Sequence, residues 1–152
     1  RTGVDIDNKT VTELSFLKNI IGIKDATGEI DRIDILKENV DKEFLFLSGD
    51  DTTFLDYMRH GGKGTISVTA NVRPDLMHDV CKNMLNHKYE VAKKINKKLE
   101  PLHNAMFLES NPIPVKWLLN YLGKINSKIR LPLVNLDEKY HQKLITAYEA
   151  TL

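Results

Sequence analysis

The chain has 152 residues, 41% of them hydrophobic, and a formal net charge of +1 at pH 7, which suffices for one hydrophobic core of ordinary size. Charges this evenly balanced offer no basic surface for nucleic acid or anionic lipid, so neither is expected as a partner. The apolar runs are too short to span a bilayer and the N-terminus has no secretory signal pattern, so no membrane attachment is expected.

Helices and apolar strands alternate in the first half of the chain. Thr10 and Glu13 have the spacing of a capping box at the start of the first helix. Asp50 and Asp51 lie in a turn with Ser48 and Gly49, where an aspartate can cap the helix that follows. The sequence predicts helices over residues 10–18, 30–37 and 52–59. Each helix is followed by a predicted strand, over residues 20–23, 43–47 and 64–68.

After residue 70 the pattern is helical only. The sequence predicts helices over residues 74–87, 89–107, 112–122 and 137–152, with a connecting turn over residues 130–133. Strands that are apolar along their whole length, separated by helices, indicate an α/β fold with a parallel sheet. Three such strands do not close a barrel and would leave exposed edges, so we expect the chain to be the later part of something larger.

Two motifs that could suggest a ligand are better explained by local structure. Gly61-Gly62-Lys63-Gly64-Thr65 contains the glycines and the lysine of a phosphate loop, but a glycine follows the lysine and the loop precedes a strand. Asp50 and Asp51 lack a third ligand at suitable spacing, and the histidines show no zinc spacing. No metal is therefore expected.

Cys81 is the single cysteine and lies in a helical pattern. One cysteine cannot form an intrachain disulfide, and a single unpaired cysteine favours a reducing, cytoplasmic compartment. Cys81 is a weak candidate for a nucleophile, because a buried thiol in a helix is usually structural. We therefore expect Cys81 to be buried and to have no chemical role.

Lys24 is the strongest catalytic candidate. It ends an apolar run and precedes a loop that contains Gly28, so hydrocarbon on one side is expected to desolvate the amine in part and favour its neutral form. A neutral amine attacks a ketone to give a Schiff base. The carboxyl ends of parallel strands form the functional face of such folds, and here they carry residues 24–27, 48–51 and 67–71. The alternative is a solvated lysine that merely ends a strand.

Four motifs in register resemble the 4-hydroxy-tetrahydrodipicolinate synthase (dihydrodipicolinate synthase) family, which belongs to the pyruvate-dependent Schiff-base lyases of class I aldolase type. These motifs are Gly22-Ile-Lys24-Asp-Ala-Thr-Gly28, Leu47-Ser-Gly-Asp-Asp51, Gly64-Thr-Ile-Ser-Val-Thr-Ala-Asn71 and Asn111-Pro-Ile-Pro-Val-Lys116. The resemblance covers essentially the whole chain. The last motif favours this synthase over N-acetylneuraminate lyase and the sugar-acid aldolases.

The resemblance implies a (β/α)8 TIM barrel followed by a C-terminal helical domain. Residues 1–72 would hold strands six to eight of that barrel, which is incomplete in this chain, and residues 73–152 would form the helical domain. Barrels of this kind typically need about 250 residues. The resemblance also implies a homotetramer built as a dimer of dimers, in the cytoplasm.

The implied reaction is the condensation of pyruvate with L-aspartate 4-semialdehyde in the biosynthesis of lysine and diaminopimelate. Lys24 would form the Schiff base with pyruvate, so that no metal or organic cofactor is needed. Arg1 would anchor the carboxylate of the semialdehyde. Gly49 and Ile66 would line the pyruvate pocket, the glycine by close approach of its backbone and the isoleucine by its carbonyl and its apolar side chain.

The chain departs from the family pattern by what it lacks. The threonine and two tyrosines of the proton relay, the threonine pair that holds the pyruvate carboxylate and the lysine-feedback residues all belong to earlier strands. The isolated chain is therefore expected to be inactive. Two alternatives stay open: another Schiff-base lyase of this fold, such as N-acetylneuraminate lyase, and a non-catalytic helical interaction module.

Overall fold

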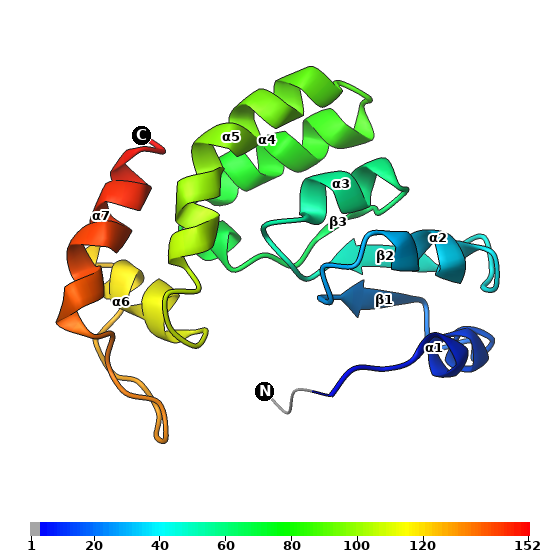
Figure 1. The fold of residues 1–152 in the computed structure, drawn as a ribbon, viewed down its shortest axis with the longest axis horizontal. Coiled ribbons are helices and arrows are strands. Elements are labelled where there is room, and N and C mark those ends of the chain that lie inside the picture. The colour runs from blue at the N-terminus through cyan, green and yellow to red at the C-terminus, as the bar shows by residue number, and fades with distance from the viewer. Residues whose placement is uncertain (1–3) are drawn as a thin grey trace. The chain divides into compact units, whose positions relative to one another are not determined.

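The computed structural model describes residues 4–152, which divide into two compact units, residues 4–66 and residues 67–152. Figure 1 follows the chain through both units, with three strands in the first and helices in the second. Each unit has its own cluster of buried hydrophobic side chains. No helix in the described part of the chain is both long and apolar enough to cross a membrane.

The first unit contains a three-stranded parallel sheet in the order β1-β2-β3. The strands are β1 (Gly22–Asp25), β2 (Leu45–Ser48) and β3 (Gly64–Thr65). The expected α/β class with parallel strands is confirmed. Each strand differs in its bounds from the apolar run that predicted it, because pairing with the neighbouring strand, rather than hydrophobicity, sets where a strand starts and stops.

Three helices accompany this sheet: α1 (Asn8–Ser15), α2 (Asp31–Lys37) and α3 (Phe54–Arg59). The predicted capping box at Thr10 is wrong. Helix α1 begins two residues earlier because the carboxylate of Asp7 accepts a hydrogen bond from the Thr10 N–H at 2.7 Å. The buried cluster of this unit brings the helices and the sheet together through Val11, Ile33, Leu36, Phe44, Phe46 and Tyr57.

The turn after β2 forms where the sequence predicts it, but neither aspartate is the N-cap of α3, which is Thr53 and has no side-chain capping bond. One carboxylate oxygen of Asp50, Oδ2, accepts hydrogen bonds from the N–H groups of Thr52 and Thr53 at 3.2 and 2.9 Å, and from both of their hydroxyls. These bonds satisfy donors in the turn that directly precedes α3. Asp51, next to it, is buried, with only 1% of its surface exposed.

The second unit is helical, as expected from the pattern after residue 70. Its elements are η1 (Thr69–Asn71), α4 (Pro74–Leu85), α5 (Tyr89–Ala105), α6 (Ile113–Tyr121), η2 (Glu138–Tyr140) and α7 (His141–Glu149). Helices α4 and α5 lie side by side (Figure 1). The helix expected over residues 137–152 is shorter, since a 3-10 turn precedes α7. Cys81 is half-buried rather than buried, because it lies beside the buried stripe of α4 and not within it.

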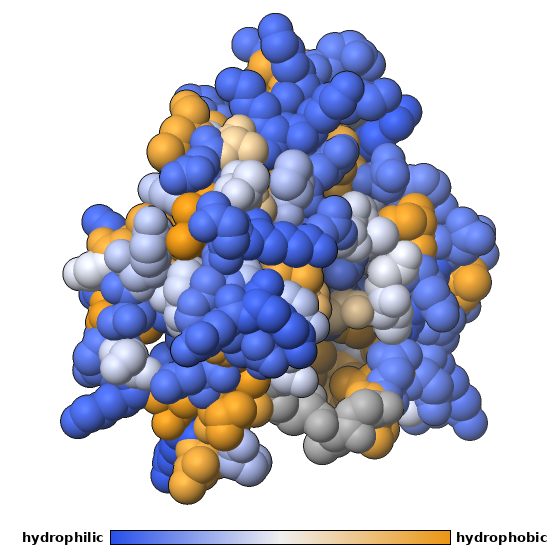
Figure 2. Space-filling model, turned by 60° about the vertical axis from the view of Figure 1, so that its left-hand side comes forward, coloured by the Kyte–Doolittle hydropathy of each residue, from blue (hydrophilic) through white to orange (hydrophobic). Residues whose placement is uncertain are grey.

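Large hydrophobic side chains remain exposed around the start of β1. Phe16 is 72% exposed, Leu17 51% and Ile21 68%. On the face drawn in Figure 2, hydrophobic residues form separate groups among hydrophilic ones. Because β1 is at one edge of the sheet, its free backbone groups and the neighbouring apolar side chains lie at the same border of the first unit.

Candidate active site

The carboxyl ends of the three strands lie side by side in the first unit. Asp25 pairs with Ser48, and Ser48 pairs with Thr65. Two backbone bonds continue this alignment beyond the strands: Gly49 N–H donates to the Asp25 carbonyl at 2.6 Å, and Ile66 N–H donates to the Ser48 carbonyl at 2.8 Å. The segments that carry Lys24, Gly49 and Ile66 therefore meet at one edge of the sheet.

Lys24 and Gly49 are in direct contact. A Cβ atom added at Gly49 would stand 2.6 Å from Lys24 Cε and 2.8 Å from the Cβ of Ala26, distances at which something must move. Only glycine therefore allows the lysine side chain to pass over the backbone at this point. Lys24 and, through the family resemblance, Gly49 were predicted as site residues, but the sequence does not reveal that one makes room for the other.

The exposure of Lys24 differs from the sequence expectation. Its side chain was expected to be partly desolvated, but Lys24 is exposed. The reason lies in its strand: β1 is paired on one side only, with β2, so residues 4–66 place no strand beyond the lysine. The contact with Gly49 fixes the path of the side chain without removing the amine from water.

Of the other two predicted substrate-binding residues, Ile66 and Arg1, the structure describes only Ile66. Ile66 directly follows β3 and is 49% exposed. Arg1 lies outside the described residues. The carboxyl-end segment over residues 67–71 belongs to the second unit, in which Thr69–Asn71 form η1.

A buried charged cluster lies next to Lys24 and was not found from the sequence. Asp25, the residue after Lys24, has 4% of its surface exposed, and Arg32 of α2 has 5%. Asp25 Oδ1 accepts from the Thr27 N–H at 3.0 Å and from the Thr27 hydroxyl at 2.7 Å, and it stands 3.6 Å from Arg32 Nη1. The only sequence signal was an arginine between the apolar positions Ile30 and Ile33, which by itself is compatible with an exposed side chain.

Arg32 also binds the segment that precedes α1. Its Nε donates to Asn8 Oδ1 at 2.9 Å, its Nη1 donates to both carboxylate oxygens of Asp5 at 3.0 and 2.8 Å, and its Nη2 donates to the Ile6 carbonyl. Every nitrogen of the guanidinium thus has a partner. A buried guanidinium is tolerated when its donors are satisfied and its charge is compensated, and Asp5 and Asp25 supply the compensation.

Tyr57 of α3 lies near the charged cluster of Asp25 and Arg32, and both charges act on its hydroxyl. Its ring is 3% exposed and packs in the hydrophobic cluster of the first unit. Burial raises the pKa of Tyr57 well above its ordinary value, and the negative charge of Asp25 raises it further, while Arg32 opposes the change. The Tyr57 hydroxyl is therefore neutral at any physiological pH and acts as a polar group rather than as a base.

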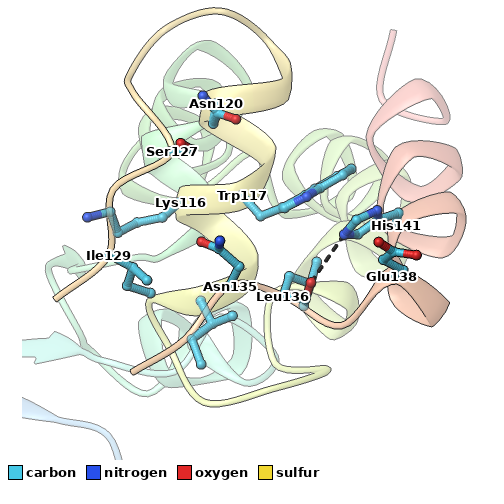
Figure 3. A pocket seen from close by; sticks show the side chains of 10 residues that line it. Lys116, Trp117, Asn120, Ser127, Ile129, Asn135, Leu136, Glu138 and His141 are labelled. Atoms are coloured by element: carbon cyan, nitrogen blue, oxygen red, sulfur yellow. Dashed lines mark hydrogen bonds between the residues drawn. The ribbon is translucent and has the colours of Figure 1, made fainter. Parts of the chain in front are cut away.

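A cavity of about 240 Å³ in the second unit is separate from these residues. It lies between α6, the following loop and the start of α7, and Figure 3 shows Trp117 of α6 beside His141 of α7 at its edge. The two rings are stacked with their centroids 4.1 Å apart, and His141 Nε2 donates to the Leu136 carbonyl at 3.2 Å. This cavity contains none of the predicted catalytic residues.

Metal binding has no candidate site within residues 4–152. No group of three or more histidine, cysteine, aspartate or glutamate side chains in this range is placed to hold an ion. The chemistry available at the strand ends is that of a primary amine, backbone N–H and carbonyl groups, and one apolar side chain. This set suits covalent capture of a small carbonyl compound.

Comparison with known proteins adds independent evidence. The model of the dihydrodipicolinate synthetase family matches residues 1–151. Curated 4-hydroxy-tetrahydrodipicolinate synthases of Psychrobacter sp. and Pseudomonas aeruginosa are 50% and 49% identical to the chain, over 95% and 99% of its length. The chain spans 48% and 52% of these two relatives, that is, about half of their length.

Solved structures give the same result. The chloride-inhibited dihydrodipicolinate synthase of Acinetobacter baumannii, complexed with pyruvate, matches with a TM-score of 0.94 and 44% identity, over 99% of this chain and 52% of that one. A synthase of Cyanidioschyzon merolae with lysine bound matches with a TM-score of 0.93 and 28% identity, over 99% of this chain and 51% of that one. Both likenesses extend over nearly all of the chain and about half of the matched protein.

Proposed function

Because the chain belongs to the dihydrodipicolinate synthetase family, we propose that it is part of a 4-hydroxy-tetrahydrodipicolinate synthase. This lyase would condense pyruvate with L-aspartate 4-semialdehyde in the biosynthesis of lysine and diaminopimelate. The observation that carries the proposal is the passage of the Lys24 side chain over Gly49 at aligned strand ends. Since the chain spans about half of its relatives, the activity belongs to the complete enzyme.

Lys24 is the proposed catalytic residue. Its neutral amine attacks the ketone carbon of pyruvate, and loss of water leaves a protonated imine. The imine withdraws electrons, so a proton leaves the methyl group and an enamine forms. The enamine carbon then attacks the aldehyde of the second substrate, and ring closure by the substrate's amino group releases the lysine. The lysine supplies all of the activation, so the proposed reaction uses no metal or organic cofactor.

Gly49, Ile66 and Arg1 are the proposed substrate-binding residues. Gly49 lets the Lys24 side chain pass close to its backbone, and its N–H bonds to the Asp25 carbonyl, which fixes the loop beside the amine. Ile66 offers a carbonyl and an apolar surface at the neighbouring strand end. A guanidinium such as that of Arg1 can bind a carboxylate through two parallel hydrogen bonds.

We place this chain in the second half of a (β/α)8 barrel enzyme. In this proposal residues 1–72 carry strands six to eight and residues 73–152 form the C-terminal helical domain. The free edge of β1 and the exposed side chains of Phe16, Leu17 and Ile21 support this placement, because earlier strands and helices would cover them. The proposed enzyme is a cytoplasmic homotetramer.

The test is covalent trapping of pyruvate on the full-length protein, as its natural source produces it. The protein is incubated with pyruvate and borohydride, and the adduct is located by intact mass and peptide mapping. We expect a reduced adduct on the peptide that contains Lys24, and no adduct in the Lys24→Ala variant. Lys18→Ala, which changes another exposed lysine just before β1, is the matched control and should label normally.

Two results would contradict the proposal. A full-length protein that gives no adduct, or one labelled on a different lysine, would exclude Lys24 as the Schiff-base residue. A substrate panel then separates the lyases of this fold: cleavage of a sialic acid with no use of aspartate semialdehyde would favour an N-acetylneuraminate lyase. Unchanged properties of the Lys24→Ala variant in every assay would favour a non-catalytic module.

A further inference from the structure

The cavity of the second unit combines an apolar wall with a cation that has no partner. Its volume is about 240 Å³, and Ile113, Ile129 and Leu136 contribute the apolar wall. Liquid water occupies about 30 Å³ per molecule, so a cavity of this volume holds an organic molecule of about eight heavy atoms. We propose that it binds a small monocarboxylate with an apolar body, and that the Lys116 ammonium binds the carboxylate. Such binding requires no chemistry at Lys24.

Lys116 is the cation of this cavity. It is half-buried on α6 and follows the buried Val115 in the sequence. Within residues 4–152 its ammonium makes no hydrogen bond and no ion pair. A charged group that is partly withdrawn from water is stabilised by a partner of opposite charge. A surface lysine can also lay its stem on apolar side chains and keep its ammonium in water, so the charges around the cavity decide between these two arrangements.

The sequence around the cavity carries positive charge only. Residues 110–136 contain Lys116, Lys124, Lys128 and Arg130 but no aspartate or glutamate, although the whole chain has a net charge of only +1. The last three side chains are exposed on the loop after α6, which forms one wall of the cavity. Charges of one sign around a hollow raise the local concentration of ions of the opposite sign. These surroundings favour an anion at Lys116.

The other end of the cavity limits the ligand to one carboxylate. Figure 3 shows Lys116 and Glu138 on opposite sides of Asn135. The Glu138 side chain makes no hydrogen bond and no ion pair with the described residues, so its negative charge would repel a second carboxylate. The Asn135 side chain also has no hydrogen bond in this part of the chain, so its amide N–H groups can donate to the carboxylate beside Lys116.

The wall beside Glu138 is held in place by two stacked rings. The centroids of Trp117 and His141 are 4.1 Å apart, and His141 also donates to the Leu136 carbonyl. Because Trp117 belongs to α6 and His141 to α7, the stack fixes one helix against the other at the edge of the cavity (Figure 3). A pocket that is formed before its ligand arrives loses little conformational entropy on binding.

The test is a calorimetric titration of the full-length protein with 4-methylpentanoate, a monocarboxylate of the size that the cavity holds. Saturating pyruvate is present, so that the probe stays out of the proposed pyruvate pocket. We expect saturable binding with a Kd of about 1 mM or lower. Lys116→Met keeps the apolar stem but removes the charge, and Asn135→Asp adds a negative charge to the cavity. Each should weaken binding by about tenfold or more.

Lys124→Met is the matched control. It removes a positive charge from the same segment, but Lys124 does not line the cavity, so the Kd should stay within about twofold of wild type. Two comparison ligands check the chemistry. The neutral 4-methylpentanamide lacks the negative charge, and glutarate has a second carboxylate, so both should bind about tenfold more weakly or less well still.

Three results would overturn the site. They are binding that does not saturate below about 10 mM, an equal loss of affinity in Lys116→Met and Lys124→Met, and equal affinity for the acid and its amide. Trapping of pyruvate on Lys24 is measured separately in the same protein. Its failure would contradict the proposed function but not the carboxylate site, because the titration does not depend on an adduct.

Discussion

Lys24 lies across the backbone of Gly49, so the two residues share one small space at the end of the sheet: a Cβ there would be 2.6 Å from Lys24 Cε and 3.1 Å from its Cγ. One clash falls on the flexible Lys24 side chain, and the other, at 2.8 Å, falls on the Cβ of Ala26, which moves only with its backbone. A substitution at Gly49 should therefore redirect the amine and also shift the backbone around Ala26.

We expect Gly49→Ala to slow pyruvate trapping on Lys24 by about a hundredfold, because a displacement of about 1 Å at a reacting group has effects of this size. The Tm should fall as well, because the new Cβ also meets the Cβ of Ala26. The measurement is the rate of adduct formation in full-length protein, with Glu29→Ala, an exposed change in the adjoining loop, as the control. A variant that traps pyruvate at the wild-type rate would show that Gly49 does not govern the path of Lys24.

Asp75 should make the stability of the second unit depend on acid pH. The Arg73 guanidinium donates to both Asp75 oxygens, at 2.9 and 2.6 Å, and lowers the pKa of Asp75 from 3.8 to about 2. A carboxyl group with a depressed pKa stabilises the folded chain at pH values above its pKa in the unfolded chain. This contribution disappears as the pH falls towards its pKa in the folded chain. Because the Asp75 side chain is 60% exposed, the contribution is about 1 kcal/mol or less.

The check for Asp75 is urea unfolding at several pH values between about 5 and about 2. Wild type should lose stability over this range by more than Asp75→Asn, which has no carboxylate to protonate. Asp79→Asn, an exposed change on the same helix, should behave like wild type. Identical pH dependence in wild type and Asp75→Asn would contradict the prediction.

Thr69 should contribute to the stability of the second unit through a buried histidine. Thr69 is fully buried, and its hydroxyl lies 2.8 Å from His103 Nδ1, while His103 Nε2 lies 3.2 Å from Asn96 Oδ1. In the neutral ring Nε2 carries the proton, because the Asn96 oxygen can only accept, and the Thr69 hydroxyl then donates to Nδ1. Thr69→Val removes that donor at nearly constant shape and should lower the free energy of unfolding by about 1–3 kcal/mol.

Thr69→Ser separates the hydroxyl from the methyl group. It keeps the donor to His103 and loses only the buried methyl, so it should cost about 1 kcal/mol. Denaturant unfolding of both variants gives the comparison. If Ser destabilises the chain more than Val does, packing of the methyl rather than the hydrogen bond accounts for the burial of Thr69.

Trp117 provides an optical probe of the cavity in the second unit, since it is the single tryptophan of the chain. His141→Ala removes the ring stacked on Trp117 and the bond to the Leu136 carbonyl. We expect a red-shifted Trp emission and a loss of about 1–2 kcal/mol in unfolding free energy. Gln142→Ala, on the exposed side of α7, should change neither, and an unshifted His141→Ala spectrum would contradict the stacking.

Local sequence signals predicted the elements better than their ends. The alternation of apolar runs and helical spacing predicted the parallel α/β class, and the turn at Asp50 was predicted correctly, although its aspartate bonds within the turn rather than capping α3. The first helix was misplaced because the prediction rested on the spacing of Thr10 and Glu13 alone, whereas in the structure Asp7 accepts the bond from the Thr10 N–H. Competition between neighbouring caps is decided by the entry path of the chain, which a pattern does not contain.

In the candidate site, local sequence predicted single residues but not the contacts between them. Lys24 was predicted as a site residue from its place after an apolar run, and it stays a prediction, whereas its contact with Gly49 depends on the register between two strands. Arg32 was missed for a different reason. Its partners, Asp5 and Asn8, lie 27 and 24 residues away in the sequence, so no local spacing connects them. Residues joined by long-range contacts become visible only when the fold brings them together.

The side-by-side helices α4 and α5 have a consequence for the order of folding. They are joined by a tight turn in which His87 has a φ of 59°, and they pack against each other over segments that are close in the sequence. Contacts of short sequence separation form quickly, whereas the parallel strands β1, β2 and β3 must wait for chain crossovers to close. During refolding, amides in α4 and α5 should thus become protected before those of the sheet, which makes the helical hairpin the kinetic nucleus of this chain.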